Sequence, residues 1–124
     1  MIHVDTSALI ASLTGTRPAA VTMRGFISDG LRLGLSTLVL FEWLRGPRQP
    51  QEIVSQEILL PSHAAFAFGH DEAALAADLY RRLARRRHRE VDIAIAACAI
   101  ANGAALWTLN PQDFSDIPGL TLAS

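Results

Sequence analysis

The sequence predicts an α/β fold in which a mostly parallel central sheet is covered by helices on both faces. Short apolar runs, typical of buried strands, alternate along the chain with longer segments whose apolar residues recur at helical spacing. Half of the 124 residues are hydrophobic, which suits a chain that builds its own core. The length fits one domain that spans residues 1–124.

The first half of the chain predicts two strands and four helices, separated by residues that interrupt regular structure. Gly15 and Pro18 divide the first two helices, Gly30 ends the second, and Gly46 with Pro47 ends the third. The predicted elements are a strand over 1–4, helices over 6–13 and 19–29, a strand over 32–36, and helices over 37–45 and 51–60.

The second half contains the strongest helical signal. Leu75, Leu79 and Leu83 recur every four residues, so one face of this segment is apolar. Gly103 ends the last helix, and the Asn110-Pro111 pair turns the chain. The predicted elements are a strand over 64–68, helices over 71–87 and 91–102, and strands over 104–109 and 119–122.

The basic residues exclude several functions. All 11 are arginines, and there is no lysine. A phosphate-binding P-loop and a Schiff-base enzyme both need a lysine, as do phosphorylated receiver domains and haloacid dehalogenase-like phosphatases. Those phosphatases also have a second aspartate two residues after the first, where this chain has Ser7 after Asp5. The net charge of −1 indicates neither a nucleic-acid nor a membrane partner.

The single cysteine and the N-terminal pattern predict a cytoplasmic location without membrane contact. Cys98 cannot form an internal disulfide, and its alanine-rich surroundings predict a buried, inert thiol. Asp5 interrupts the first apolar residues, which is unlike a signal peptide. The longest apolar run in a predicted helix is far shorter than the ~20 residues needed to span a bilayer.

Four carboxylates stand at places where a charge is unexpected. They follow a strand, lie within an apolar helix or open one, and a buried charge without a partner is costly. Parallel sheets place ligand sites beyond the carboxyl ends of their strands. Oxygen ligands suit Mg²⁺, whereas no pair of histidines or cysteines has the spacing of a zinc site. We therefore predict a divalent cation that acts on phosphate, held by Asp5, Glu42, Asp92 and Asp113.

Each of these acids also has a local explanation. An aspartate before a helix can cap it, a glutamate can pair with an arginine one turn later, and an acid in the first helical turn is favoured by the helix dipole. These alternatives are a cap by Asp5, a pair of Glu42 with Arg45, a dipole effect at Asp92, and a turn of Asp113 with Asn110 and Pro111.

Four segments in sequence carry a resemblance to a known family. They are residues 4–10 (VDTSALI), 41–46 (FEWLRG), 91–97 (VDIAIAA) and 108–114 (TLNPQDF). In these segments the chain resembles the PIN-domain ribonucleases and, within them, the VapC-type toxins of bacterial toxin–antitoxin pairs. The resemblance implies a three-layer α/β/α fold and a Mg²⁺- or Mn²⁺-dependent endoribonuclease. It also implies neutralisation by a small protein antitoxin and assembly into a homodimer.

The resemblance also assigns residues. Residues 89–91 (REV) depart from it, because small or polar residues are more familiar before the third acid. Pro111 lies in a turn and is tolerated there. The resemblance places metal-pocket roles on Asp5, Glu42, Asp92 and Asp113, and supporting polar roles on Thr6, Ser7, Thr108 and Asn110.

A mechanism follows from these roles. A divalent cation lowers the pKa of water and neutralises charge on the phosphate oxygens. We expect Asp5 to be the central ligand, with Asp92 and Asp113 beside it, and Glu42 to bind a second ion or to orient the attacking water. Asp116 lies close enough in sequence to take the place of Asp113.

A run of arginines near residue 85 suggests contact with RNA or a protein partner, since arginine pairs bidentately with phosphate. A solvated helix end is the alternative, in which Asp78 pairs with Arg82. The candidates are Arg81, Arg82, Arg85 and Arg86. Two other functions also remain open for the whole chain: a housekeeping PIN nuclease in RNA maturation, and a catalytically silent PIN module that binds RNA or protein.

Overall fold

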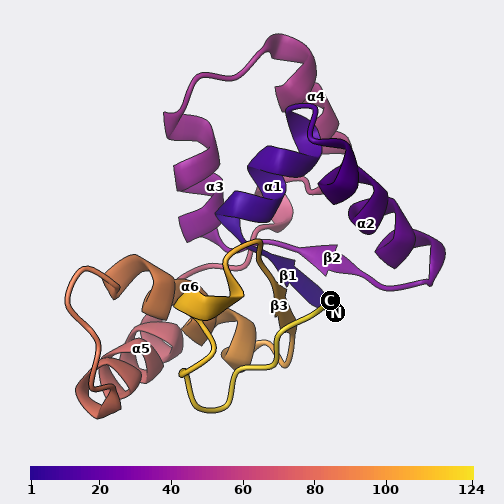
Figure 1. Ribbon diagram of the computed structural model, residues 1–124. Coiled ribbons are helices and arrows are strands. Elements are labelled where there is room, and N and C mark those ends of the chain that lie inside the picture. The colour runs from indigo at the N-terminus through magenta and orange to yellow at the C-terminus, as the bar shows by residue number, and fades with distance from the viewer.

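The computed structural model describes residues 1–124 and has a small parallel sheet at its centre (Figure 1). The strand order is β2 (Leu33–Gly34), β1 (Ile2–Val4), β3 (Ala105–Trp107). Both pairings are parallel, with His3 opposite Gly34 on one side and Leu106 on the other. All three strands therefore end at the same edge of the sheet, where we expected the site.

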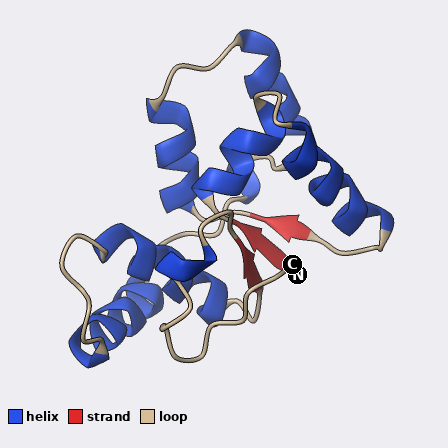
Figure 2. Cartoon of the chain, viewed as in Figure 1, coloured by secondary structure: helices blue, strands red, loops and turns tan.

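Six α-helices cover the sheet from both sides (Figure 2). The first four pack together on one side, and the last two lie on the other. This arrangement confirms the predicted three-layer α/β/α fold. The helices are α1 (Thr6–Leu13), α2 (Arg17–Ser28), α3 (Thr37–Arg45), α4 (Pro50–Leu59), α5 (His70–Arg82) and α6 (Glu90–Ala101), with short 3₁₀ turns at Ser62–Ala64 and Pro111–Asp113.

Helix α6 forms the centre of the core. Every residue from Ile93 to Ala99 is buried, because α6 contacts both β3 and α5. Its small side chains permit this close approach, and the thiol of Cys98 is buried among them, as predicted. Gly103 adopts a φ of +64°, a conformation that glycine accepts without strain. The amide of Ala104 can then donate to the carbonyl of Ala99 and end the helix.

Two predicted strands are wrong. Residues 64–68 form only one bridge, between Ser36 and Phe66, because α3 begins at Thr37 and the neighbouring chain leaves the sheet there. The Thr37 hydroxyl then accepts from the Phe68 amide in place of a strand. Residues 119–122 likewise form a single bridge, between Leu106 and Leu122. The other strands are shorter than predicted, so the sheet is smaller than the sequence indicates.

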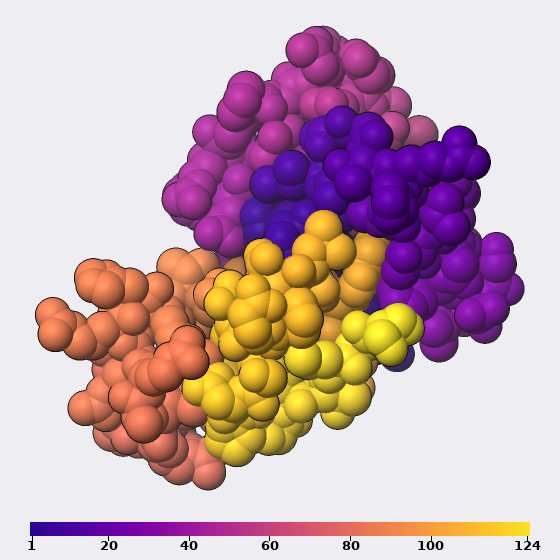
Figure 3. Space-filling view, viewed as in Figure 1, coloured from indigo at the N-terminus to yellow at the C-terminus, as the bar shows by residue number.

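The helix predicted over 71–87 ends early, at Arg82. Leu83 takes an extended conformation and is buried in the core, which turns the chain out of the helix. Residues 84–88 then form an exposed loop that protrudes beside α5 (Figure 3). No helix is long and apolar enough to cross a membrane.

Candidate active site

Asp5 lies directly after β1, at the carboxyl edge of the sheet. Its amide donates to the carbonyl of Trp107 (2.8 Å), so the backbone is fixed between β1 and β3. Its carboxylate accepts from the Thr108 hydroxyl (2.7 Å) and the Ser7 hydroxyl (3.1 Å). The residue is 5% exposed, and its side chain makes no capping hydrogen bond to α1. The helix-cap explanation therefore does not account for this buried carboxylate.

Glu42 reaches the same region from α3. The Thr6 hydroxyl donates to its Oε1 (2.5 Å), and this bond joins the start of α1 to α3. Its Oε2 lies 3.5 Å from the guanidinium of Arg45, so the pair expected one helical turn apart is also present. Arg45 is mostly exposed, and an exposed pair of this kind contributes little to stability. The pairing with Arg45 is compatible with a role for Glu42 in the site.

Asp92 lies in the first turn of α6, and its pKa depends in part on the charges of the other three acids. Its pKa is raised to about 6, mainly by burial and then by the charges of Asp5, Asp113 and Glu42. Burial also raises the pKa of Asp5, against its hydrogen bonds from Thr108 and Ser7. We refer to these four carboxylates, three of which affect the pKa of the fourth through their charge, as the acidic cluster. The fold therefore gathers residues that are up to 108 positions apart in the chain.

Hydroxyl groups order the edge of this cluster. The hydroxyls of Ser7 and Thr108 lie 3.3 Å apart, and the Ser7 hydroxyl accepts from the Leu109 amide (3.1 Å). The Thr108 hydroxyl accepts from the Asn110 amide (3.0 Å). Asn110 itself is exposed, and its side chain forms no hydrogen bond. Ser7 and Thr108 therefore support Asp5 directly, whereas Asn110 contributes through its backbone.

The donor set fits a hard divalent cation in its chemistry. It offers carboxylate and hydroxyl oxygens and no histidine or cysteine. Burial and, after it, the charges of the other acids raise the pKa of Asp92. No group of three or more acidic, histidine or cysteine side chains is already placed to hold an ion. The side chains must therefore close in for an ion to bind. Asp113, at the end of its 3₁₀ turn, is half-buried beside the cluster.

Asp116 is engaged elsewhere. Both of its carboxylate oxygens accept from Arg89, at 2.9 and 2.6 Å, and this bonding lowers the pKa of Asp116. The alternative in which Asp116 replaces Asp113 is disfavoured by this ion pair. Arg89 was not among the candidate site residues. The one signal for it was the departure from the family pattern at residues 89–91.

The candidate arginine contacts lie at the end of α5 and in the loop after it. Arg82 and Arg81 both pair with Asp78, at 3.2 and 3.7 Å, as the helix-end alternative expects. Arg86 donates to the Arg81 carbonyl and lies over the ring of Tyr80. The guanidinium of Arg85 forms no hydrogen bond or ion pair and is exposed. Among the four candidates, Arg85 is the one free to meet a phosphate.

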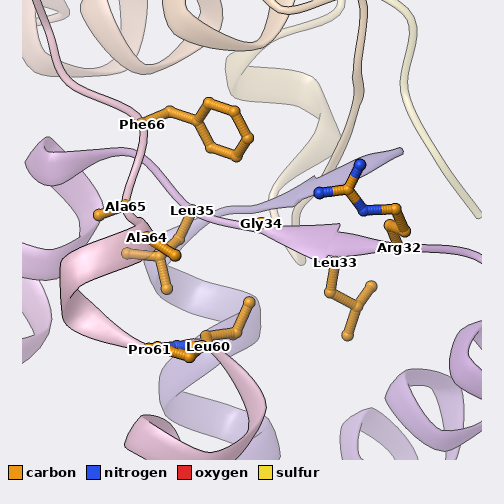
Figure 4. A pocket seen from close by; sticks show the side chains of 9 residues that line it. All are labelled: Arg32, Leu33, Gly34, Leu35, Leu60, Pro61, Ala64, Ala65 and Phe66. Atoms are coloured by element: carbon orange, nitrogen blue, oxygen red, sulfur yellow. The ribbon is translucent and has the colours of Figure 1, made fainter.

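Five hollows lie outside the acidic cluster, and none of the four acids lines any of them. A small, mostly apolar pocket lies beside β2, between Leu33 and Phe66 (Figure 4). An open, almost wholly apolar groove lies between α3, α5 and α6. This apolar groove is lined by Leu38, Phe68, Ala76, Ala77, Tyr80, Arg81, Glu90, Val91, Ile93 and Ala94.

Comparison with known proteins identifies similar chains. The PIN domain family model matches residues 2–120. Ribonuclease VapC19 from Mycobacterium tuberculosis is 34% identical over 120 residues, which cover 94% of both chains. The DNA-bound VapBC from Salmonella typhimurium has a TM-score of 0.78 at 20% identity, covering 98% of this chain and 96% of that one. VapBC2 from Rickettsia felis, bound to a promoter DNA fragment, has a TM-score of 0.72 at 20% identity, covering 99% and 98%.

Proposed function

Because this chain belongs to the PIN domain family, we propose that it is a metal-dependent endoribonuclease and the toxin of a toxin–antitoxin pair. The observation that supports the chemistry is the cluster of four carboxylates at the carboxyl edge of the sheet. The name of the relative from M. tuberculosis, a ribonuclease, supports the substrate class. Full-length similarity to that relative makes a shared activity the simplest interpretation.

The four acids have distinct roles in this proposal. Asp5, Asp92 and Asp113 would hold Mg²⁺ or Mn²⁺, and Glu42 would hold a second ion or orient the attacking water. The ion, when bound, lowers the pKa of water and neutralises charge that develops on the phosphate. The leaving group is a ribose 3′-oxygen.

The surrounding residues prepare these acids. Thr108 and Ser7 hold one oxygen of Asp5 in place, which leaves the other oxygen for a ligand. Thr6 orients Glu42 through a short hydrogen bond. The pKa of Asp92 is about 6, so its carboxylate is mostly ionised at neutral pH. A metal ion can therefore bind there without first displacing a proton from most of the molecules.

Cleavage of a structured RNA by the purified protein in Mn²⁺ tests the activity. We expect Asp5→Asn to abolish cleavage, because a central ligand is lost, and to leave the metal-free protein at least as stable. Sequencing of RNA ends after brief expression, with the same variant as control, would identify the substrate. Tight binding without cleavage by the unaltered protein would instead support the silent PIN module. A large fall in the melting temperature of Asp5→Asn would show that Asp5 is structural.

The toxin role has a separate test. Solved structures of similar fold include VapBC toxin–antitoxin assemblies, and the chain exposes apolar side chains on α4, where Ile58 is 74% exposed. An antitoxin could cover such side chains. We expect growth arrest on expression, relieved by co-expression of a short neighbouring reading frame. Normal growth with efficient cleavage of one precursor RNA would favour a housekeeping nuclease.

A further inference from the structure

Arg89 is the only buried arginine in the chain. Its guanidinium donates twice to the carboxylate of Asp116, from Nη1 at 2.9 Å and from Nη2 at 2.6 Å. Nη2 also donates to the Asp113 carbonyl at 2.8 Å, and Nη1 donates to the Arg85 carbonyl. All four terminal N–H groups therefore have acceptors. Such charge-assisted, forked contacts are among the strongest hydrogen bonds in proteins.

These bonds join two segments that each contain an acid of the cluster. Arg89 immediately precedes α6, and its carbonyl accepts from the Ile93 amide, so it is part of the turn that contains Asp92. Its guanidinium reaches the segment around Asp113 through that residue's own carbonyl. Burial of Phe114 anchors the same segment from the core side. Arg89 thus sets the position of Asp113 relative to Asp92.

The segment needs such a restraint because like-charged carboxylates that lie near one another repel. The Nε atom of Arg89 is buried and forms no hydrogen bond, so the terminal nitrogens make all the contacts that hold the segment. A lysine could supply the charge but not the fork that reaches Asp116 and the Asp113 carbonyl together.

We propose that Arg89, oriented by Asp116, is a positioning residue that keeps Asp113 beside Asp92, so that both carboxylates can close on a divalent cation. This inference rests on the proposed metal-dependent function. It assigns a role to the residue at which the chain departs from the family pattern, and it explains why Asp116 lies so near the cluster without joining it. Arg89 touches neither the ion nor the substrate, and it acts through Asp113.

Mn²⁺ binding to the full chain, measured by isothermal titration calorimetry, tests this role. We expect Arg89→Lys and Asp116→Asn to raise the Mn²⁺ dissociation constant by roughly 10- to 100-fold, as loss of a partner of a metal ligand usually does. The double variant should be no weaker than the weaker single variant, since both changes break one contact. Arg87→Gln is the matched control, because Arg87 is an exposed arginine in the same loop without side-chain contacts. It should bind Mn²⁺ as the unaltered protein does.

Cleavage kinetics give a second readout. At saturating Mn²⁺ we expect both single variants to cleave RNA within about threefold of the unaltered rate, because the ligands themselves remain. Folded variants that bind Mn²⁺ with unaltered affinity would overturn the inference and leave a structural ion pair. If Arg89→Lys fails to fold, Asp116→Asn decides, because it keeps the two bonds from Arg89 to carbonyls. Absence of Mn²⁺ binding and cleavage in the unaltered protein would instead overturn the proposed function itself.

Discussion

Asp92 is charged at neutral pH in a place where its charge is costly. Its pKa in the folded protein is about 6, above the ordinary value of 3.8, because of burial and three neighbouring acids. Between these two values the folded protein binds a proton that the unfolded chain releases. The group therefore lowers stability above pH 6, and this penalty fades as the pH falls towards 4.

Asp92→Asn should remove that penalty. In EDTA at pH 7.5, we expect the variant to melt about 2–6 °C higher than the unaltered protein, a modest gain because water screens part of the repulsion. The difference should shrink at pH 4.5, where Asp92 is protonated. Thermal denaturation followed by circular dichroism measures both values, and a lower melting temperature at pH 7.5 would contradict the cluster.

His3 has the opposite effect on stability. It lies in β1, is 2% exposed, and stacks on Phe66 with ring centroids 4.8 Å apart. Burial lowers its pKa from 6.5 to about 4. The unfolded chain therefore takes up a proton that the folded protein excludes, and stability falls as the pH drops from 6.5 to 4.

His3→Phe should remove this loss of stability at low pH. The buried Nε2 of His3 forms no hydrogen bond, so the substitution leaves no other group without its partner. Relative to the unaltered protein, we expect the variant to gain about 2–3 kcal/mol between pH 7.5 and pH 4.5. Urea denaturation at both pH values gives the difference, and the acids present in both proteins cancel. If the stabilities of the two proteins changed with pH in parallel, folded His3 would take up its proton as readily as it does in the unfolded chain.

Among the elements, α6 depends most on small side chains. Ala97 is fully buried where the helix lies between the sheet and α5. Ala97→Leu should destabilise the protein by about 1–3 kcal/mol, since added methylenes in a close-packed core force neighbours apart. Ala101→Leu, an exposed position at the end of the same helix, is the control and should change stability by less than about 0.5 kcal/mol. Equal urea midpoints for the two variants would contradict the packing described.

We expect the loop between α5 and α6 to contact RNA through its exposed arginines. Arg85 is free, whereas Arg81 and Arg82 are paired with Asp78. In the Asp5→Asn background, Arg85→Glu with Arg86→Glu should reduce the slope of log affinity against log salt by about one to two, the loss of up to two phosphate contacts. Arg17→Glu with Arg24→Glu on α2 makes the same charge change and should leave the slope unaltered. An unchanged slope in the first variant would reject the RNA role.

The molecule as a whole has an apolar groove in which we expect a second copy of the chain to bind. Interfaces between permanent partners are more apolar than ordinary surface, and this groove has only Arg81 and Glu90 as charged residues. In a two-fold arrangement, Arg81 of one copy can face Glu90 of the other. The resemblance to VapC-type toxins also implies a homodimer.

Ala77→Glu, at a residue that lines the groove, should prevent the expected dimer from forming, because a desolvated charge without a partner opposes association. Light scattering after size exclusion measures the mass, which we expect to fall from twice the chain mass to once. Ala74→Glu is the control, since Ala74 is exposed on α5 outside the groove. A monomeric unaltered protein would reject the homodimer.

Local sequence was enough to predict the order and type of nearly all elements. Helices such as Thr6–Leu13 and Thr37–Arg45 depend on side chains three and four positions apart, and on glycines and prolines that end them. The place of an acid after a strand is equally local. The parallel arrangement of strands then required Asp5 and the segment after β3 to meet at one edge.

Long-range packing decided the remainder. The extent of a strand depends on how far its neighbour continues. Residues 64–68 form only one bridge because the neighbouring chain becomes helix α3 at Thr37. Helix α5 ends at Arg82 because Leu83 turns into the core, so the arginines from residue 85 onward lie outside the helix. The raised pKa of Asp92 and the bond of Arg89 to Asp116, 27 residues away, depend on distances that exist only in the folded chain. Burial and charge interactions are properties of neighbours in space, and no local pattern of residues specifies them.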